Sequence, residues 1–181
     1  MRALILAAGR GTRLGELTKD TPKPMLDVAG KPILEHIIFH LHQNGVKEVM
    51  VKVHYKADVI MNYFGDRVTY MYSDCDEDTA IQFAKPWFRG DFMLVQNGDT
   101  LTDLDIRGLF KLGNGRSVRF MDMKSPKVYA GTTILSPHYL EGYTKEIYEC
   151  AVDAKWWDCG TPERLKAVRE HYEKTFDLPD L

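Results

Sequence analysis

The N-terminal segment places a short apolar run directly before a loop rich in glycine and arginine. Residues 3–8 are continuously apolar, and Gly9 follows them. Such a run suits a central parallel strand that is covered on both faces. It is too short to span a bilayer, and it leads into a loop rather than a signal-peptide cleavage site. The segment therefore predicts a buried strand within an α/β sheet.

The loop after this strand has the features of a phosphate-binding loop. It contains Gly9 and Gly11, which allow backbone conformations and close contacts that a Cβ would block. Free N–H groups in such a loop can cradle phosphate oxygens, and Arg10 and Arg13 add permanent positive charge. Glycine alone is weak evidence, because many strand-to-helix turns contain it. The combination of strand, glycines and arginines favours a phosphorylated ligand.

Two other kinds of glycine loop fit the sequence poorly. A Walker A loop needs G-x-x-x-x-G-K-[ST], which does not occur here. A dinucleotide-binding fold needs G-x-G-x-x-G and an acidic residue about 20 residues further on. Gly15 stands at the wrong spacing after Gly11, and the next predicted strand runs into His54 without a carboxylate. A dehydrogenase is therefore the function that this loop supports least.

Strand and helix signals alternate through the first half of the chain, and this alternation predicts βαβ units with a parallel sheet. The second half is less regular, with two strand signals joined by a Lys/Ser/Pro turn and a final helix that Thr161 can cap. The predicted strands cover residues 3–8, 49–53, 67–72, 92–96, 117–123 and 128–135. The predicted helices cover residues 32–44, 57–64, 79–87 and 161–174.

Three charged residues stand where phosphate chemistry would need them. Lys23 lies between two prolines, which fix φ and stiffen its support. Asp99 follows an apolar strand and a glycine, so it falls at the carboxyl end of a strand, where open α/β sheets bind ligands. Asp158 lies between Trp157 and the final helix that Thr161 can cap. A single Asp in a turn is ordinary turn chemistry. As a pair in these contexts, the two carboxylates favour a Mg²⁺ site.

Together these motifs resemble the sugar nucleotidyltransferase family, whose members make NDP-sugars. The family signature is an L-A-A-G-x-G-[ST]-R-L loop followed shortly by P-K-P, and this sequence carries both at residues 6–14 and 22–24. The resemblance continues in the family's order through residues 30–35, 97–99, 129–132 and 157–162. It implies a short member of the family with an α/β, Rossmann-like three-layer fold and a central, mostly parallel sheet.

The resemblance also implies a role for each matching residue. Arg13, Lys23 and Asp99 would be catalytic, and Asp99 and Asp158 would share a Mg²⁺ ion. The residues that would bind the nucleotide are Leu6, Ala7, Ala8, Gly9, Arg10, Gly11, Thr12, Arg13, Lys23, Asn97 and Gly98. The candidates for binding the second substrate are Gly131, Lys124, Lys127 and Trp157.

Two regions depart from the family pattern. Relatives carry a glycine-rich, base-reading stretch where this chain has acidic residues between Asp74 and Asp78, so the base is left open. We interpret the acidic stretch either as a solvated loop that caps the helix predicted from Thr79 or as a surface for a cationic or hydroxyl-rich substrate. The region after Leu112 is short, which fits a small pocket, an exposed substrate or completion by a second subunit in a homodimer.

Composition limits the remaining classes of protein. The 181 residues carry a formal net charge of -2, which suits one globular domain and argues against nucleic acid or an anionic membrane as a partner. Three cysteines without a C-x-x-C predict neither a disulfide framework nor a zinc site, and they favour a reducing cytoplasm. We predict one domain over residues 1–181, with a nucleotide-binding half (1–112) and a substrate and metal half (113–176).

Two histidines on the first long helix need a separate interpretation. His36 and His40 are spaced four residues apart, which can suit a metal. We interpret them as lying on the face opposite the apolar residues Ile33 and Ile37. We therefore predict that both side chains are exposed.

The leading hypothesis is a Mg²⁺-dependent enzyme that converts an NTP and a sugar 1-phosphate to an NDP-sugar and pyrophosphate. One alternative is a cytidylyltransferase of the same fold that acts on a phosphorylated alcohol such as phosphocholine, which the acidic stretch would favour. Another is a non-catalytic, nucleotide-binding regulatory subunit, which the short second half would allow.

Overall fold

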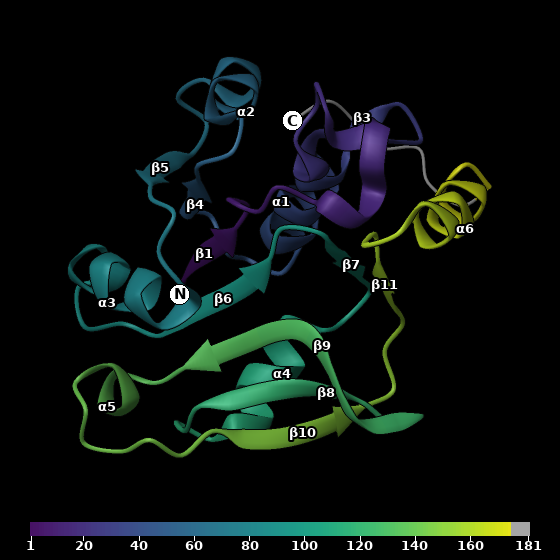
Figure 1. Cartoon of the computed structure of the whole chain (residues 1–181). Coiled ribbons are helices and arrows are strands. Elements are labelled where there is room, and N and C mark those ends of the chain that lie inside the picture. The colour runs from purple at the N-terminus through teal and green to yellow at the C-terminus, as the bar shows by residue number, and fades with distance from the viewer. Residues whose placement is uncertain (175–181) are drawn as a thin grey trace.

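The computed structural model describes residues 1–174, including every side chain except those of residues 125–127 (Figure 1). One large sheet runs through the molecule, and helices cover it on both faces. Within residues 1–174, no helix combines the length and the apolar character that a membrane crossing requires.

The central sheet has seven strands and is mostly parallel. Its strands are β1 (Arg2–Leu6), β4 (Val49–Val53), β5 (Thr69–Tyr72), β6 (Met93–Asn97), β8 (Val118–Asp122), β9 (Ser125–Leu135) and β10 (Tyr148–Val152). Their order is β10-β8-β9-β6-β1-β4-β5, and β1 runs parallel to both of its neighbours. Strand β9 runs antiparallel to both β6 and β8.

Two small antiparallel ladders lie outside this sheet. One joins β2 (Asp27–Val28) to β3 (Lys31–Pro32), and the other joins β7 (Thr100–Thr102) to β11 (Trp156–Asp158). The second ladder positions the site, because β7 follows β6 closely while β11 comes from the end of the chain. It therefore brings the last part of the chain back to the carboxyl edge of the central strands (Figure 1).

Helices form the layers on the two faces of the sheet. They are α1 (Ile33–Gln43), α2 (Ala57–Phe64), α3 (Glu77–Phe88), α4 (Ile106–Gly113), α5 (Pro137–Leu140) and α6 (Pro162–Tyr172), with the 3-10 helices η1 (Thr12–Thr18) and η2 (Lys23–Met25). Helices α3 and α5 share one apolar cluster with the sheet, and α1, α2, α4 and α6 share the other. Burial between these two clusters explains why residues 3–5 of β1 are apolar and fully buried.

The predicted fold class is confirmed: the chain is α/β, with a mostly parallel sheet between helical layers. Strand 49–53 and helix 57–64 have the predicted bounds. Helix α3 begins at Glu77 instead of Thr79, because the Asp76 side chain accepts a hydrogen bond from the Thr79 backbone N at 2.9 Å and caps the helix two residues earlier. Strand β9 begins at Ser125 instead of Val128.

The prediction that His36 is exposed is wrong. His36 is 4% exposed, and its Nε2 lies 2.7 Å from the carbonyl oxygen of Val28. Its ring packs edge-on against Tyr172 of α6, with centroids 5.1 Å apart. His36 and His40 follow Ile33 by three and seven residues, so they lie on the same side of α1 as the apolar stripe, where β2 and α6 cover His36. Burial lowers the pKa of His36 and of His40.

Candidate active site

The loop after β1 is held at both ends by backbone hydrogen bonds. At its root, the Ala7 N donates to the Lys52 carbonyl and the Gly98 N donates to the Leu6 carbonyl, both at 3.0 Å. At its far end, Gly11 has a φ of 65°, and its carbonyl accepts a hydrogen bond from the Thr18 hydroxyl at 3.1 Å. Thr18, which was not among the predicted site residues, is buried and fixes this end of the loop.

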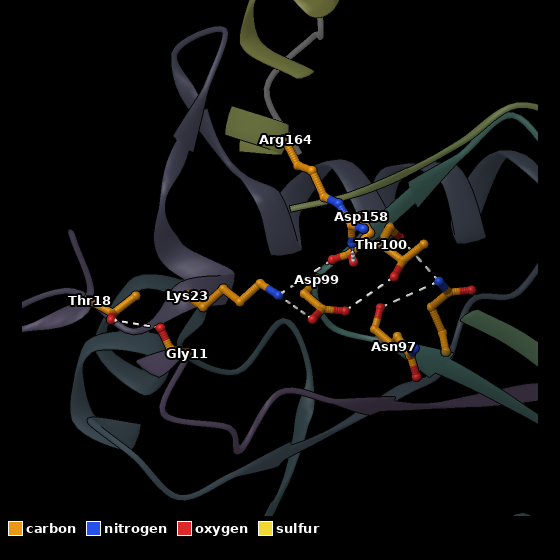
Figure 2. A network of polar contacts seen from close by, with 9 residues as sticks. Gly11, Thr18, Lys23, Asn97, Asp99, Thr100, Asp158 and Arg164 are labelled. Carbon is orange, nitrogen blue, oxygen red and sulfur yellow. Dashed lines mark hydrogen bonds and ion pairs between the residues drawn. The ribbon is translucent and has the colours of Figure 1, made fainter. Parts of the chain in front are cut away.

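The side chain of Lys23 crosses from η2 to the two predicted carboxylates. Pro22 precedes η2 with a φ of −65°, and the stem of Lys23 packs so closely on Gly11 that a Cβ there would lie 3.0 Å from the lysine Cβ. The lysine side chain is only 8% exposed. Its Nζ forms an ion pair with Asp99 Oδ2 and lies 3.7 Å from Asp158 Oδ1 (Figure 2).

The β7–β11 ladder explains how two distant aspartates come together. Asp158 is the register partner of Thr100, the residue after Asp99. The Cys159 N also donates to the Asp99 carbonyl at 3.0 Å, and the Thr100 hydroxyl donates to Asp99 Oδ1 at 3.2 Å. Both carboxylates therefore face one buried ammonium group, in the position where a cation can be shared.

Two arginines approach Asp158 from other directions. A methyl group on Gly160 would lie 2.7 Å from Asp158 Oδ1 and 2.9 Å from Arg13 Nη2, so both groups converge on this glycine. Arg164 in α6 forms an ion pair with Asp158 Oδ2, on the side away from Lys23 (Figure 2). Arg164 was not among the predicted site residues. Its position in the first turn of α6, six residues after Asp158, was the available signal.

A polar pocket of about 390 Å³ opens beside these charges. It contains nine of the residues predicted to bind the nucleotide, together with Pro24 and Asp99. Its lining residues are Leu6, Ala7, Gly9, Gly11, Thr12, Arg13, Lys23, Pro24, Asn97, Gly98 and Asp99. Ala8 and Arg10 are outside this lining, and the Arg10 guanidinium lies 5.7 Å from the centre of the Tyr55 ring. The pocket thus combines exposed loop backbone with positive charge.

The residues predicted to bind a second substrate are more scattered. Gly131 has a φ of 85°, and a Cβ there would lie 3.0 Å from the Thr100 side chain, so this part of β9 approaches β7 closely. Lys124 is exposed in the turn between β8 and β9. The side chain of Lys127 lies outside the described residues. The Trp157 ring stacks on His171 of α6 at 4.7 Å and lines a separate, mostly apolar pocket behind β7.

The cysteine beside the two aspartates is not built to act as a nucleophile. Cys159 is fully buried, and burial raises the pKa of its thiol to about 12. The thiol therefore stays protonated at neutral pH, whereas a nucleophilic cysteine needs its thiolate. The chemistry that the site can perform rests on binding and neutralising anionic oxygens.

Comparison with known proteins shows which family the chain resembles in sequence. Residues 2–117 match the family model described as nucleotidyl transferase. The protein GlmU of Methanococcus maripaludis, described as bifunctional, is 39% identical over 126 residues, which make up 67% of this chain and 30% of that protein. The N-acetylmuramate alpha-1-phosphate uridylyltransferase of Neisseria meningitidis is 39% identical over 120 residues, or 61% of this chain and 52% of that protein.

The solved structures extend the likeness to the whole fold. HddC from Yersinia pseudotuberculosis superposes with a TM-score of 0.78 at 23% identity, covering 94% of this chain and 99% of that one. The matched region amounts to about half, or less, of the length of the two relatives above. Because the family model covers well over half of the sequence, the chain belongs to the nucleotidyl transferase family.

Proposed function

We propose that this chain joins an NTP to a sugar 1-phosphate and releases pyrophosphate. The observation that carries the proposal is the convergence of Lys23, Asp99 and Asp158 beside a pocket lined by the glycine loop. Charge neutralisation and positioning are the main tasks in the transfer of phosphorus groups. The buried ammonium of Lys23, the nearby guanidinium of Arg13 and the two carboxylates can neutralise charge and position the substrates.

The nucleotide would lie against residues of the 1–112 half. The loop between Ala7 and Gly11 exposes backbone to the pocket, and nothing lies within 4 Å of the position that a Cβ on Gly9 would take. That space suits the close approach of a phosphate or a ribose to the main chain. Arg13 and Lys23 then offset the negative charge of the triphosphate.

The transfer itself needs no protein nucleophile. An oxygen of the acceptor phosphate attacks the α-phosphorus of the NTP, forming a new P–O–P bond. The bond between the α-phosphorus and the oxygen bridging to the β-phosphorus breaks, and pyrophosphate leaves with that electron pair. No proton has to move, because the acceptor phosphate is already ionised at neutral pH. Lys23 and Arg13 stabilise the charge that grows on these oxygens.

The two carboxylates fit a Mg²⁺ site. Both are oxygen donors of the kind that Mg²⁺ prefers, and in this structure they already share one cation, the ammonium of Lys23. Within the described residues, no group of three or more acidic, histidine or cysteine side chains is arranged to hold a metal. Asp99 and Asp158 would hold the ion together with phosphate oxygens and water. When bound, Mg²⁺ would supply further neutralisation of phosphate charge.

A sugar 1-phosphate is the preferred acceptor in this proposal. The N-acetylmuramate relative is named for such a substrate. The acidic stretch, which would favour phosphocholine, is used in part for structure, since Asp76 caps α3. We place the acceptor near Gly131 in the 113–176 half. Lys124, Lys127 and Trp157 stay predictions, as do a homodimer and a cytoplasmic location.

A substrate panel tests the proposal. Each NTP is combined with a set of sugar 1-phosphates and with phosphocholine, and pyrophosphate release is measured with Mg²⁺ present. We expect release with one or a few sugar 1-phosphates. Release with phosphocholine alone would favour the cytidylyltransferase alternative. Nucleotide binding without release for any acceptor would overturn the proposal in favour of a regulatory subunit.

A further inference from the structure

Asp158 is held by cations on both of its carboxylate oxygens. Oδ1 faces Lys23 Nζ at 3.7 Å, and Oδ2 forms an ion pair with Arg164 (Figure 2). Arg164 stands in the first turn of α6, so its guanidinium reaches Asp158 from the side opposite the nucleotide loop. The proposed function assigns no role to this arginine.

The charges around the two carboxylates are unbalanced toward the positive side. Lys23 pairs with both Asp99 and Asp158, and Arg164 pairs with Asp158. The Arg13 guanidinium and the Asp158 carboxylate both lie beside Gly160. These three cations and two carboxylates leave one positive charge in excess. Such a cluster attracts a polyanion and repels a free divalent cation.

The two cations that contact Asp158 directly differ in how firmly they are held. The Lys23 side chain is 8% exposed, whereas the Arg164 side chain is 57% exposed. An exposed ion pair contributes little net stability, so the guanidinium can leave its carboxylate when a stronger partner arrives. The backbone of Arg164 is fixed independently, because its N donates to the capping Thr161 hydroxyl at 3.4 Å. Movement of the side chain therefore does not require movement of α6.

We propose that Arg164 competes with a divalent cation for Asp158, so that the site without nucleotide holds metal weakly. The inference rests on the proposed function, since it takes Asp158 as a metal ligand. Its consequence is that metal enters together with the triphosphate, whose negative charge offsets the excess of cations and offers Arg164 a new partner.

Titration of the nucleotide-free protein with Mn²⁺, followed by the electron paramagnetic resonance signal of free Mn²⁺, tests this inference. Arg164→Gln removes the competing charge, and we expect the Mn²⁺ dissociation constant to fall by roughly three- to tenfold, as expected for one partly screened charge near a dication. Arg164→Lys keeps the charge and should bind Mn²⁺ like the native protein. The matched control is Lys166→Gln, which removes an exposed charge from the same helix at a residue that pairs with Glu170.

The double variant Asp158→Asn, Arg164→Gln should lose the gain, because the gain acts through Asp158. Unchanged, weaker or absent Mn²⁺ binding in Arg164→Gln would overturn the inference, as would an equal gain in Lys166→Gln. A general loss of folding does not tighten metal binding, so a gain cannot arise from structural damage. The titration uses no nucleotide or acceptor, so its outcome is separable from that of the pyrophosphate-release panel.

Discussion

The phosphate side and the acceptor side of the candidate site are built differently. The phosphate side, formed by the loop from Ala7 to Gly11 with Lys23 and Asp99, is fixed by backbone hydrogen bonds and buried charge. On the acceptor side, Lys124 is exposed in a turn and the Trp157 ring packs toward α6. The residues that we propose to hold the phosphates, which every NTP shares, are therefore held in place by contacts within the protein. Among the residues predicted to bind the acceptor, Lys124 is exposed and Trp157 is half-buried.

The largest expected effect comes from the buried charges of the phosphate side. Lys23→Ala removes the ammonium that Asp99 and Asp158 share, and we expect kcat to fall by about 100-fold or more, as for other preorganised electrostatic groups. Asp99→Asn should have a comparable effect. Pyrophosphate release measures the loss, and Lys166→Ala on the surface of α6 is the control. Near-native turnover in either variant would remove that residue from the proposed machinery.

Substitutions at Gly98 and Gly9 on the phosphate side distinguish a loss of packing from a loss of nucleotide binding. Gly98→Ala would place a Cβ 2.7 Å from the Leu6 carbonyl oxygen, where backbone must shift, so we expect destabilisation of about 1–3 kcal/mol together with a loss of activity. In Gly9→Ala the new methyl meets nothing within 4 Å, so stability should change by less than about 0.5 kcal/mol while the KM for NTP rises. Denaturant unfolding and initial rates distinguish the two. An unchanged KM in Gly9→Ala would contradict backbone contact with the nucleotide.

Substitutions in the acidic stretch test whether its carboxylates take part in binding the acceptor. Asp76→Ala removes the cap of α3, and we expect a loss of about 1 kcal/mol in the free energy of unfolding. Asp74→Ala, outside the helix, is the matched control and should be close to neutral in stability. If the stretch is structural, neither change alters the KM for the acceptor. A clear KM change in Asp74→Ala would instead give these carboxylates a role in substrate recognition.

A smaller effect is expected from α1, which lies behind the site. Burial lowers the pKa of His36, so the unfolded chain takes up a proton before the folded chain does. The contribution to stability is complete above the ordinary histidine pKa of about 6.5 and is lost as the pH falls below it. The pH dependence of unfolding should therefore weaken in His36→Gln, which cannot titrate. His138→Gln, at an exposed position, is the control, and an equal change there would refute the prediction.

The sequence predicted most of the fold because its signals are local. The alternation of apolar strands and amphipathic helices predicted a mostly parallel sheet, and the bounds of β4 and α2 agree with it. The acidic stretch caps α3 as one interpretation expected, but the predicted start at Thr79 was two residues late, because Asp76 is the cap and the helix begins at Glu77. The burial of His36 was missed because the residue was assigned to the face opposite Ile33, whereas a spacing of three residues places it on the same face, against Val28 and Tyr172.

The sequence by itself determined the glycine loop after β1 and the types of charged residue that accompany it. The glycines, the stiffened Lys23 and the two aspartates are readable because short motifs carry their backbone requirements with them. Only the tertiary structure decided how these groups meet. Lys23 and Asp99 lie 76 residues apart, and Asp158 joins them through its pairing with β7. Arg164 likewise reaches Asp158 only because β11 and α6 pack beside the site. Contacts of this range depend on sheet topology and packing, which no local pattern encodes.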